Sequence, residues 1–161
     1  MSINSSDLIL LGHAGLGMAG SLLAGWVFFE ARQASKENAA RTRKLALAVA
    51  ASMAAVWILG GYWYVHSYPA DRALILKGPW PFAHSVFMEV KEHLFFMTLI
   101  LSFYLPIAAW DRLYASAAAR KMAMCVALLI ALSAIAIEGA GAIIEHGAKL
   151  ALIQANAKGA N

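Results

Sequence analysis

The chain has 161 residues, of which 61% are hydrophobic and only 14% are charged. A soluble domain usually carries about 25% charged residues, and a chain this short cannot bury so large an apolar excess inside one globule. This composition excludes an ordinary soluble enzyme and a disordered chain. The single cysteine, Cys125, excludes a disulfide scaffold, a Cys-rich zinc site and covalent c-type haem attachment. The sequence therefore predicts an all-α integral membrane protein.

Charged residues divide the chain into four apolar stretches. A helix needs about 20 apolar residues to cross a bilayer, and the third stretch reaches that length by adding a turn from the segment before it. We expect a single domain, a four-helix bundle, with a cytoplasmic connection and an outer loop between its spans. The domain covers residues 1–161, with spans at about 8–29, 45–68, 88–110 and 122–146, the cytoplasmic loop at 30–44 and the outer loop at 69–87.

The basic residues predict the orientation. Eight of the 13 lysines and arginines fall in the connections between spans one and two and between spans three and four. The positive-inside rule then places both termini on the outer, periplasmic side of a bacterial inner membrane. The net charge of +4 is explained by this topology, so we expect the lipid bilayer as a partner and no nucleic acid.

Histidines and acids gather toward the outer side. All five histidines and six of the nine acids lie in the outer half of the spans or outside them. At about 1.5 Å per residue, four side chains fall at nearly the same depth, one on each span. These are His13, Tyr62, His93 and Glu138. We therefore expect a polar chamber in the outer half of the bundle and an aliphatic inner half.

A stripe of small residues continues inward from the first of these histidines. His13, Gly17 and Gly20 share one face at helical spacing. Small residues at this spacing let membrane helices pack closely, and below a histidine they also leave a slot for a flat macrocycle. Glu138 lies within the fourth span, where an ionisable side chain costs at least ~2.5 kcal/mol and usually marks function.

Four spans, inward histidines and a small-residue slot make the chain similar to four-helix membrane cytochromes b, in which histidines on the helices clamp haem inside the bundle. The resemblance covers the four-span core. It implies haem b held by His13 and His93 as axial ligands, with His66 and His146 as the alternative pair. Gly17, Gly20 and Tyr62 would lie beside the cofactor. The expected function is electron transfer with a quinol or a periplasmic carrier, and the expected proton acceptors are Glu138, Glu89 and Glu92.

Two alternatives stay open. A non-haem site for iron, copper or zinc would use nitrogen and oxygen ligands from the same histidines and carboxylates, although Glu89-x-x-x-His93 departs from the Glu-x-x-His spacing of di-iron bundles. The chain is also of the size and small-residue content expected of an accessory subunit. In that case its partners would be other membrane subunits or further copies of itself.

Overall fold

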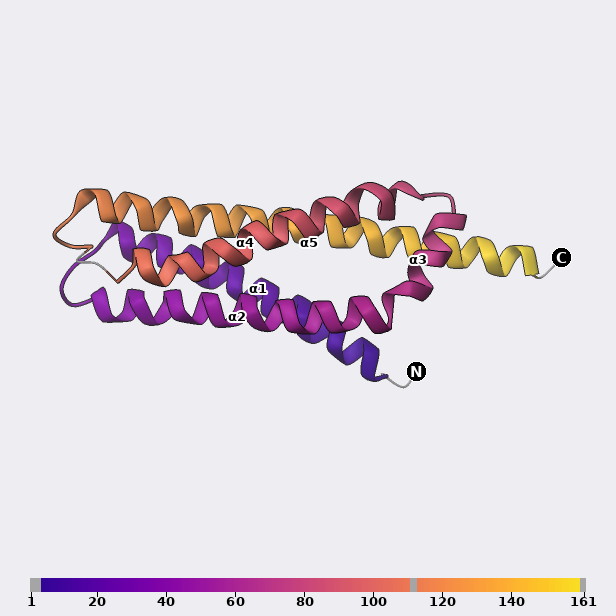
Figure 1. The fold of residues 1–161 in the computed structure, drawn as a ribbon, viewed down its shortest axis with the longest axis horizontal. Helices are drawn as coiled ribbons and strands as arrows, with labels where there is room; N and C mark the ends of the chain where they lie inside the picture. Colours follow the sequence, from indigo (N-terminus) through magenta and orange to yellow (C-terminus); the bar gives the residue numbers. More distant parts are fainter. Residues whose placement is uncertain (1–3, 111–112, 160–161) are drawn as a thin grey trace.

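The computed structural model describes residues 4–110 and 113–159, and this part of the chain is helical with no strand. Asp111, which bounds the predicted third span, lies outside the described residues. The prediction of an all-α fold is confirmed. The elements in chain order are α1 (Ser5–Arg32), α2 (Ala39–His66), α3 (Tyr68–Lys77), the π-helix η1 (Ala83–Met88), α4 (Glu89–Ala108) and α5 (Ala117–Gly159) (Figure 1).

Three of the described helices, α1, α2 and α5, are long and apolar enough to cross a membrane. α4 has 20 residues, about 30 Å of helix, but its first turn carries Glu89, Lys91 and Glu92. The fourth span and the outward placement of both termini stay predictions.

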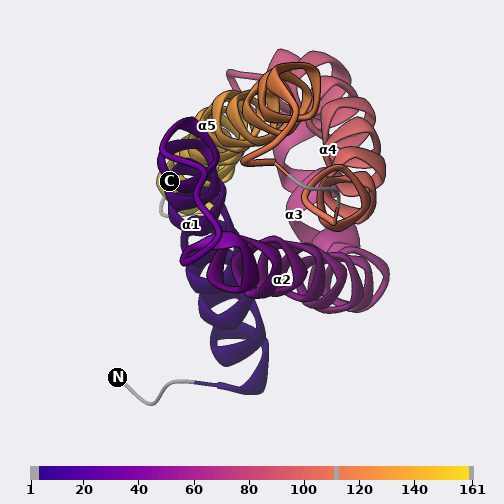
Figure 2. The ribbon, with the colours of Figure 1, turned by 90° about the vertical axis from the view of Figure 1, so that its left-hand side faces the viewer.

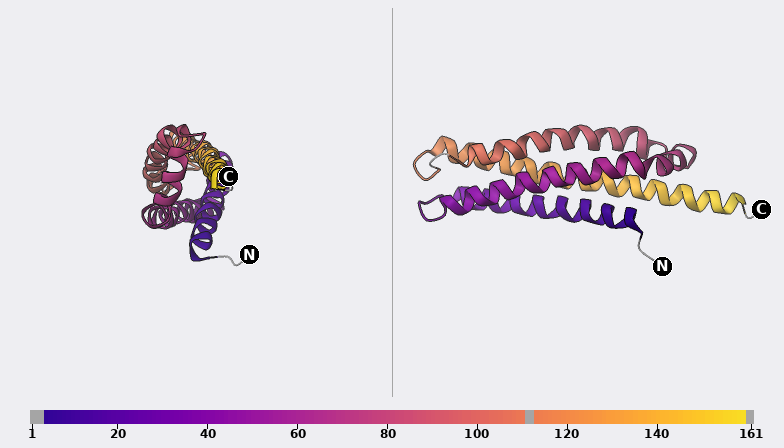
Figure 3. Two further views of the ribbon diagram at one scale, coloured as in Figure 1. Left: turned by 90° about the vertical axis from the view of Figure 1, so that its right-hand side faces the viewer. Right: turned by 60° about the horizontal axis from the view of Figure 1, so that its bottom comes forward.

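The four long helices form a ring. α1 packs on α2 and α5, and α4 packs on the same two neighbours, whereas α1 and α4 do not contact each other in the described residues (Figure 2). Figure 3 shows the same helices lying side by side along their length. Side chains that point inward from α1 and α4 therefore face each other across the ring.

The end of the ring that holds the α1–α2 and α4–α5 connections, called the inner end here, is filled by apolar side chains. Small residues on α1 let its neighbours approach, and β-branched and leucine side chains fill the remaining space. The fully buried members of this core include Ala24, Val27, Ala46, Val49, Leu105, Leu113, Ala127 and Ile130. The core of this half is mainly aliphatic, and it also encloses the fully buried polar residues Thr42 and Ser102.

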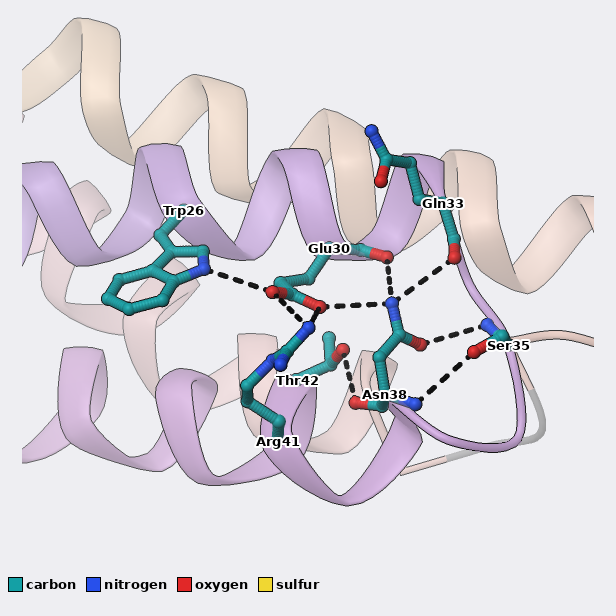
Figure 4. Close-up of polar contacts among 7 residues, drawn as sticks. All are labelled: Trp26, Glu30, Gln33, Ser35, Asn38, Arg41 and Thr42. Atoms are coloured by element: carbon teal, nitrogen blue, oxygen red, sulfur yellow. Dashed lines mark hydrogen bonds and ion pairs between the residues drawn. The ribbon is translucent and has the colours of Figure 1, made fainter.

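A polar cluster around Glu30 fastens the α1–α2 connection. The two Glu30 carboxylate oxygens lie 2.8 and 2.9 Å from Nη2 of Arg41. The same carboxylate accepts hydrogen bonds from Trp26 Nε1 at 3.0 Å and Asn38 Nδ2 at 3.0 Å (Figure 4). A carboxylate with this many donors is well compensated for its burial, so the cluster fixes the hairpin between α1 and α2.

The outer connection, between α2 and α4, is largely helical. The predicted loop 69–87 contains α3, which has a proline in its first turn, and most of η1. Only the segment 78–81, with its two prolines, is non-helical. A Cβ added at Gly78 would lie 2.5 Å from Ala151 Cβ, and one at Gly147 would lie 2.7 Å from Ala83 Cβ. Such close contacts hold α3 and η1 against the outer part of α5, so that together they form a cap.

Candidate functional site

A cavity of about 370 Å³ lies between α1, α2, α4 and α5. This volume is in the range of small-molecule sites, which are mostly apolar with a few placed polar groups. The wall follows that pattern. Its apolar members include Leu10, Met53, Val56, Trp57, Trp63, Val65, Met88, Phe95, Phe96, Ala134 and Ile137, and its ionisable members are His13, Tyr64, Lys91, Glu92 and Glu138.

His13 enters the cavity from α1 with a fixed ring. Its Nδ1 lies 3.0 Å from the Val56 carbonyl oxygen on α2. A carbonyl can only accept, so Nδ1 carries the hydrogen and donates it. In the neutral ring, Nε2 is then left as an acceptor or a metal ligand. A Cβ at Gly60 would lie 2.5 Å from His13 Cε1, so the imidazole fits here only because residue 60 has no side chain.

Glu138 and Lys91 bring opposite charges to the same cavity. A Cβ at Gly17 on α1 would lie 2.8 Å from Oε1 of Glu138, and one at Gly141 on α5 would lie 3.4 Å from Nζ of Lys91. Gly17 therefore makes room for the Glu138 carboxylate, and Gly141 lies beside the Lys91 ammonium. Among the described residues, neither group forms an ion pair within 4.0 Å or a hydrogen bond with another side chain. Both groups are thus available to a ligand.

The structure brings four of the predicted site residues to the cavity: His13, Gly17, Glu92 and Glu138. His93 and Glu89 are exposed on α4 and do not line it. His93 instead donates through Nδ1 to the Glu89 carbonyl oxygen at 2.7 Å. The expected axial pair of His13 and His93 is therefore not brought together.

The remaining predicted residues also lie away from the cavity. Tyr62 and His66 stack on each other at the surface of α2, with ring centroids 4.2 Å apart. The exposed His146 ring lies against Trp80 in the cap, at 4.9 Å. Gly20 is a packing glycine, because a Cβ there would lie 2.7 Å from Met53 Cε on α2.

The rotation of α4 about its axis explains these differences. The stripe that contains His93 is exposed, and it continues through Met97 and Ile100, which are 62% and 68% exposed. The inward stripe instead contains Lys91, Thr98 and Ser102. Lys91, like Tyr64, lines the cavity but was not predicted from the sequence as a site residue. The signal was present, because small polar residues such as Thr98 and Ser102 favour helix–helix contacts in membranes and mark the face that Lys91 shares.

The cap holds a buried histidine, His84, whose two ring nitrogens both form hydrogen bonds. Arg72 Nε donates to His84 Nε2 at 2.8 Å, so in the neutral ring the hydrogen is on Nδ1. That Nδ1 then donates to the Tyr68 hydroxyl oxygen at 2.9 Å. On the same helix as Arg72, burial raises the pKa of the Asp71 carboxyl. His84 is tied into the cap and leaves no free nitrogen for a ligand.

In the part of the chain that the structure describes, no three His, Cys, Asp or Glu side chains are grouped closely enough to hold a metal ion. The non-haem metal hypothesis therefore gains no support. No family model, curated protein or solved structure gives a significant match to the chain. Its function is argued from the chemistry of the site.

Proposed function

We propose that the chain is an integral membrane protein that binds the head group of a quinone or quinol in this cavity. All four long helices would span a bacterial inner membrane, with both termini and the cavity toward the outer side. The observation that carries the proposal is the composition of the wall. Aromatic and aliphatic side chains surround the ionisable groups, of which His13, Lys91 and Glu138 come from three different helices.

A quinone head group matches this arrangement. It is a flat apolar ring with two oxygens at opposite ends. His13 and Lys91 project from α1 and α4, which do not contact each other and lie across the ring of helices. The Lys91 ammonium can donate to a quinone carbonyl, and Nε2 of His13 can accept from a quinol hydroxyl. A quinol therefore meets a complementary group at each end, because its other hydroxyl oxygen can accept from Lys91, whereas a quinone is held by Lys91 alone.

Glu138 supports a role in proton transfer. Its carboxylate lines the cavity and can accept a proton when a quinol hydroxyl is oxidised. Complete oxidation of a quinol releases two protons and two electrons. The electrons require an acceptor, for which we propose haem b, in this chain or in a neighbouring subunit, or a periplasmic carrier.

Titration of the purified full chain with a quinone that lacks a tail tests the binding proposal. Quinones quench nearby tryptophan emission, and Trp57 and Trp63 both line the cavity. We expect saturable quenching that weakens at least tenfold in Lys91→Met. Glu89→Gln, a change in an exposed carboxylate on the same helix, serves as the control and should change affinity less than twofold. Absence of saturable quenching in the unmodified protein would refute the proposal.

Haem b on His13 is a second candidate, and one observation favours it. Haem and metal-ligating histidines usually donate their other ring nitrogen to a carbonyl or carboxylate, as His13 does to Val56. When bound, haem supplies one-electron transfer. The cavity offers one imidazole, so the described geometry does not fit a His13–His93 ligand pair. An absorption spectrum of protein from haem-replete cells tests this candidate: a haem band lost in His13→Ala and kept in His93→Ala supports it, and a colourless protein refutes it.

A further inference from the structure

The register of α2 against α4 is fixed at the inner end of the ring. The Arg43 guanidinium stacks over the Trp110 ring at 3.8 Å from its centroid, and Arg43 Nη2 donates to the Trp110 carbonyl oxygen at 3.2 Å. α2 runs away from this contact and α4 runs toward it. Residues at equal separations from Arg43 and Trp110 therefore lie at about the same level on the two helices.

Three such pairs line the cavity. Trp57 and Phe96 are each 14 residues from the Arg43–Trp110 contact, at about 21 Å. Gly61 and Glu92 are each 18 residues away, and Val65 and Met88 are each 22 residues away. The spacing of four places Trp57, Gly61 and Val65 on one stripe of α2, and Glu92 and Phe96 on one stripe of α4. Met88 is the last residue of η1, directly before α4 begins. We call these six residues the α2–α4 window.

The window reaches the surface of the molecule. Trp57, Phe96 and Val65 line the cavity although 51%, 53% and 66% of their surfaces are exposed. At the middle level, a Cβ added at Gly61 would meet no heavy atom within 4 Å. The cavity is therefore open along the seam between α2 and α4, at the level where α2 has no side chain.

We propose that the α2–α4 window is a lateral entrance for a ligand with an apolar tail, whose head group reaches Lys91 while the tail lies in the window against Trp57 and Phe96. This inference rests on the proposed quinone function and identifies the ligand as a tailed, membrane-dissolved quinone. With α2 and α4 spanning the bilayer, the window faces lipid, whereas the cap covers the outer end. A ligand dissolved in the bilayer reaches the head-group site without passing through water.

Filling the window at its open level tests the proposal. Gly61→Leu adds a side chain where a Cβ meets nothing, and leucine is a better helix former than glycine, so the variant should fold. Gly15→Leu is the matched control, because a Cβ at Gly15 also meets nothing and Gly15 does not line the cavity. Both variants and the unmodified full chain are titrated with a decyl-tailed quinone and with the same quinone without a tail.

We expect Gly61→Leu to weaken binding of the tailed quinone at least tenfold and that of the tail-less quinone less than twofold. Gly15→Leu should change neither affinity by more than twofold, and Gly61→Ala should weaken the tailed quinone two- to threefold. If Gly61→Leu leaves tailed binding unchanged, or weakens both ligands equally, the window proposal is wrong while the quinone site stands. If neither quinone binds the unmodified protein, the proposed function itself is wrong.

Discussion

Two glutamates on apolar helices have opposite surroundings. Glu30, at the inner end, receives hydrogen bonds from Trp26, Asn38 and Arg41. Glu138, in the cavity, lies against the bare backbone of Gly17 and has no ion pair among the described residues. A carboxylate that the protein itself satisfies stabilises the fold. One that the protein leaves accessible, at a cost in the membrane, is available for a ligand or a proton.

The largest expected difference between the two glutamates is in the free energy of unfolding when each carboxylate is removed in turn. Glu30→Ala leaves several donors without their acceptor, so we expect the free energy of unfolding to fall by about 2 kcal/mol. Glu138→Gln should change it by less than about 0.5 kcal/mol, because no partner is lost. Thermal and denaturant unfolding of the two variants in the same detergent measures the difference. Equal destabilisation by both changes would contradict the comparison.

Removal of a contact between α2 and α4 at the inner end should lower both the stability of the protein and the affinity of the cavity for a quinone. Arg43→Ala removes a cation–π contact and a hydrogen bond to Trp110, for an expected loss of about 1 kcal/mol. Because this contact sets the register of α2 against α4, we also expect weaker binding of a tailed quinone. Arg120→Ala, a change to another basic residue near the inner end, is the control and should affect neither quantity. Unchanged stability in Arg43→Ala would show that the contact does not hold the two helices together.

Removal of the hydrogen bond between Ser52 on α2 and the backbone of α1 should lower stability by a smaller amount. Ser52 Oγ donates to the Leu16 carbonyl oxygen at 2.8 Å. Hydrogen bonds between membrane helices contribute about 0.6 kcal/mol on average, so Ser52→Ala should lower stability by about that amount and leave quinone affinity unchanged. Unfolding curves and the quenching titration together check this, and a loss of several kcal/mol would show that Ser52 has a larger role.

Counting residues gave each side chain a depth along its helix but no rotation about the helix axis. Counting residues placed His13 and Glu138 at a common level, and both line one cavity. The same count placed His93 at that level but could not determine which way it points, because depth depends only on residue number whereas rotation depends on packing with neighbours. The prediction took the stripe of α4 that contains His93 as the inward face. That stripe is exposed, so Lys91, which lies on the inward stripe, was not predicted as a site residue.

The outer connection shows a second limit. Pro79 and Pro81 correctly indicated a break in helical structure, but the prediction extended that break over the whole segment 69–87. α3 and η1 are stabilised by tertiary contacts with α5, through Gly78 and Gly147. Contacts between segments about 70 residues apart leave no local signal in the sequence.

We propose that the cavity, and not the exposed face of α4, binds the ligand. His13 and His93 are the matched pair that tests it, since both were predicted at the same depth and only His13 lines the cavity. Equilibrium titrations with a tail-less quinol, kept reduced, should show at least a tenfold loss of affinity in His13→Ala and less than a twofold change in His93→Ala. Equal losses in both variants, or a loss only in His93→Ala, would contradict the account.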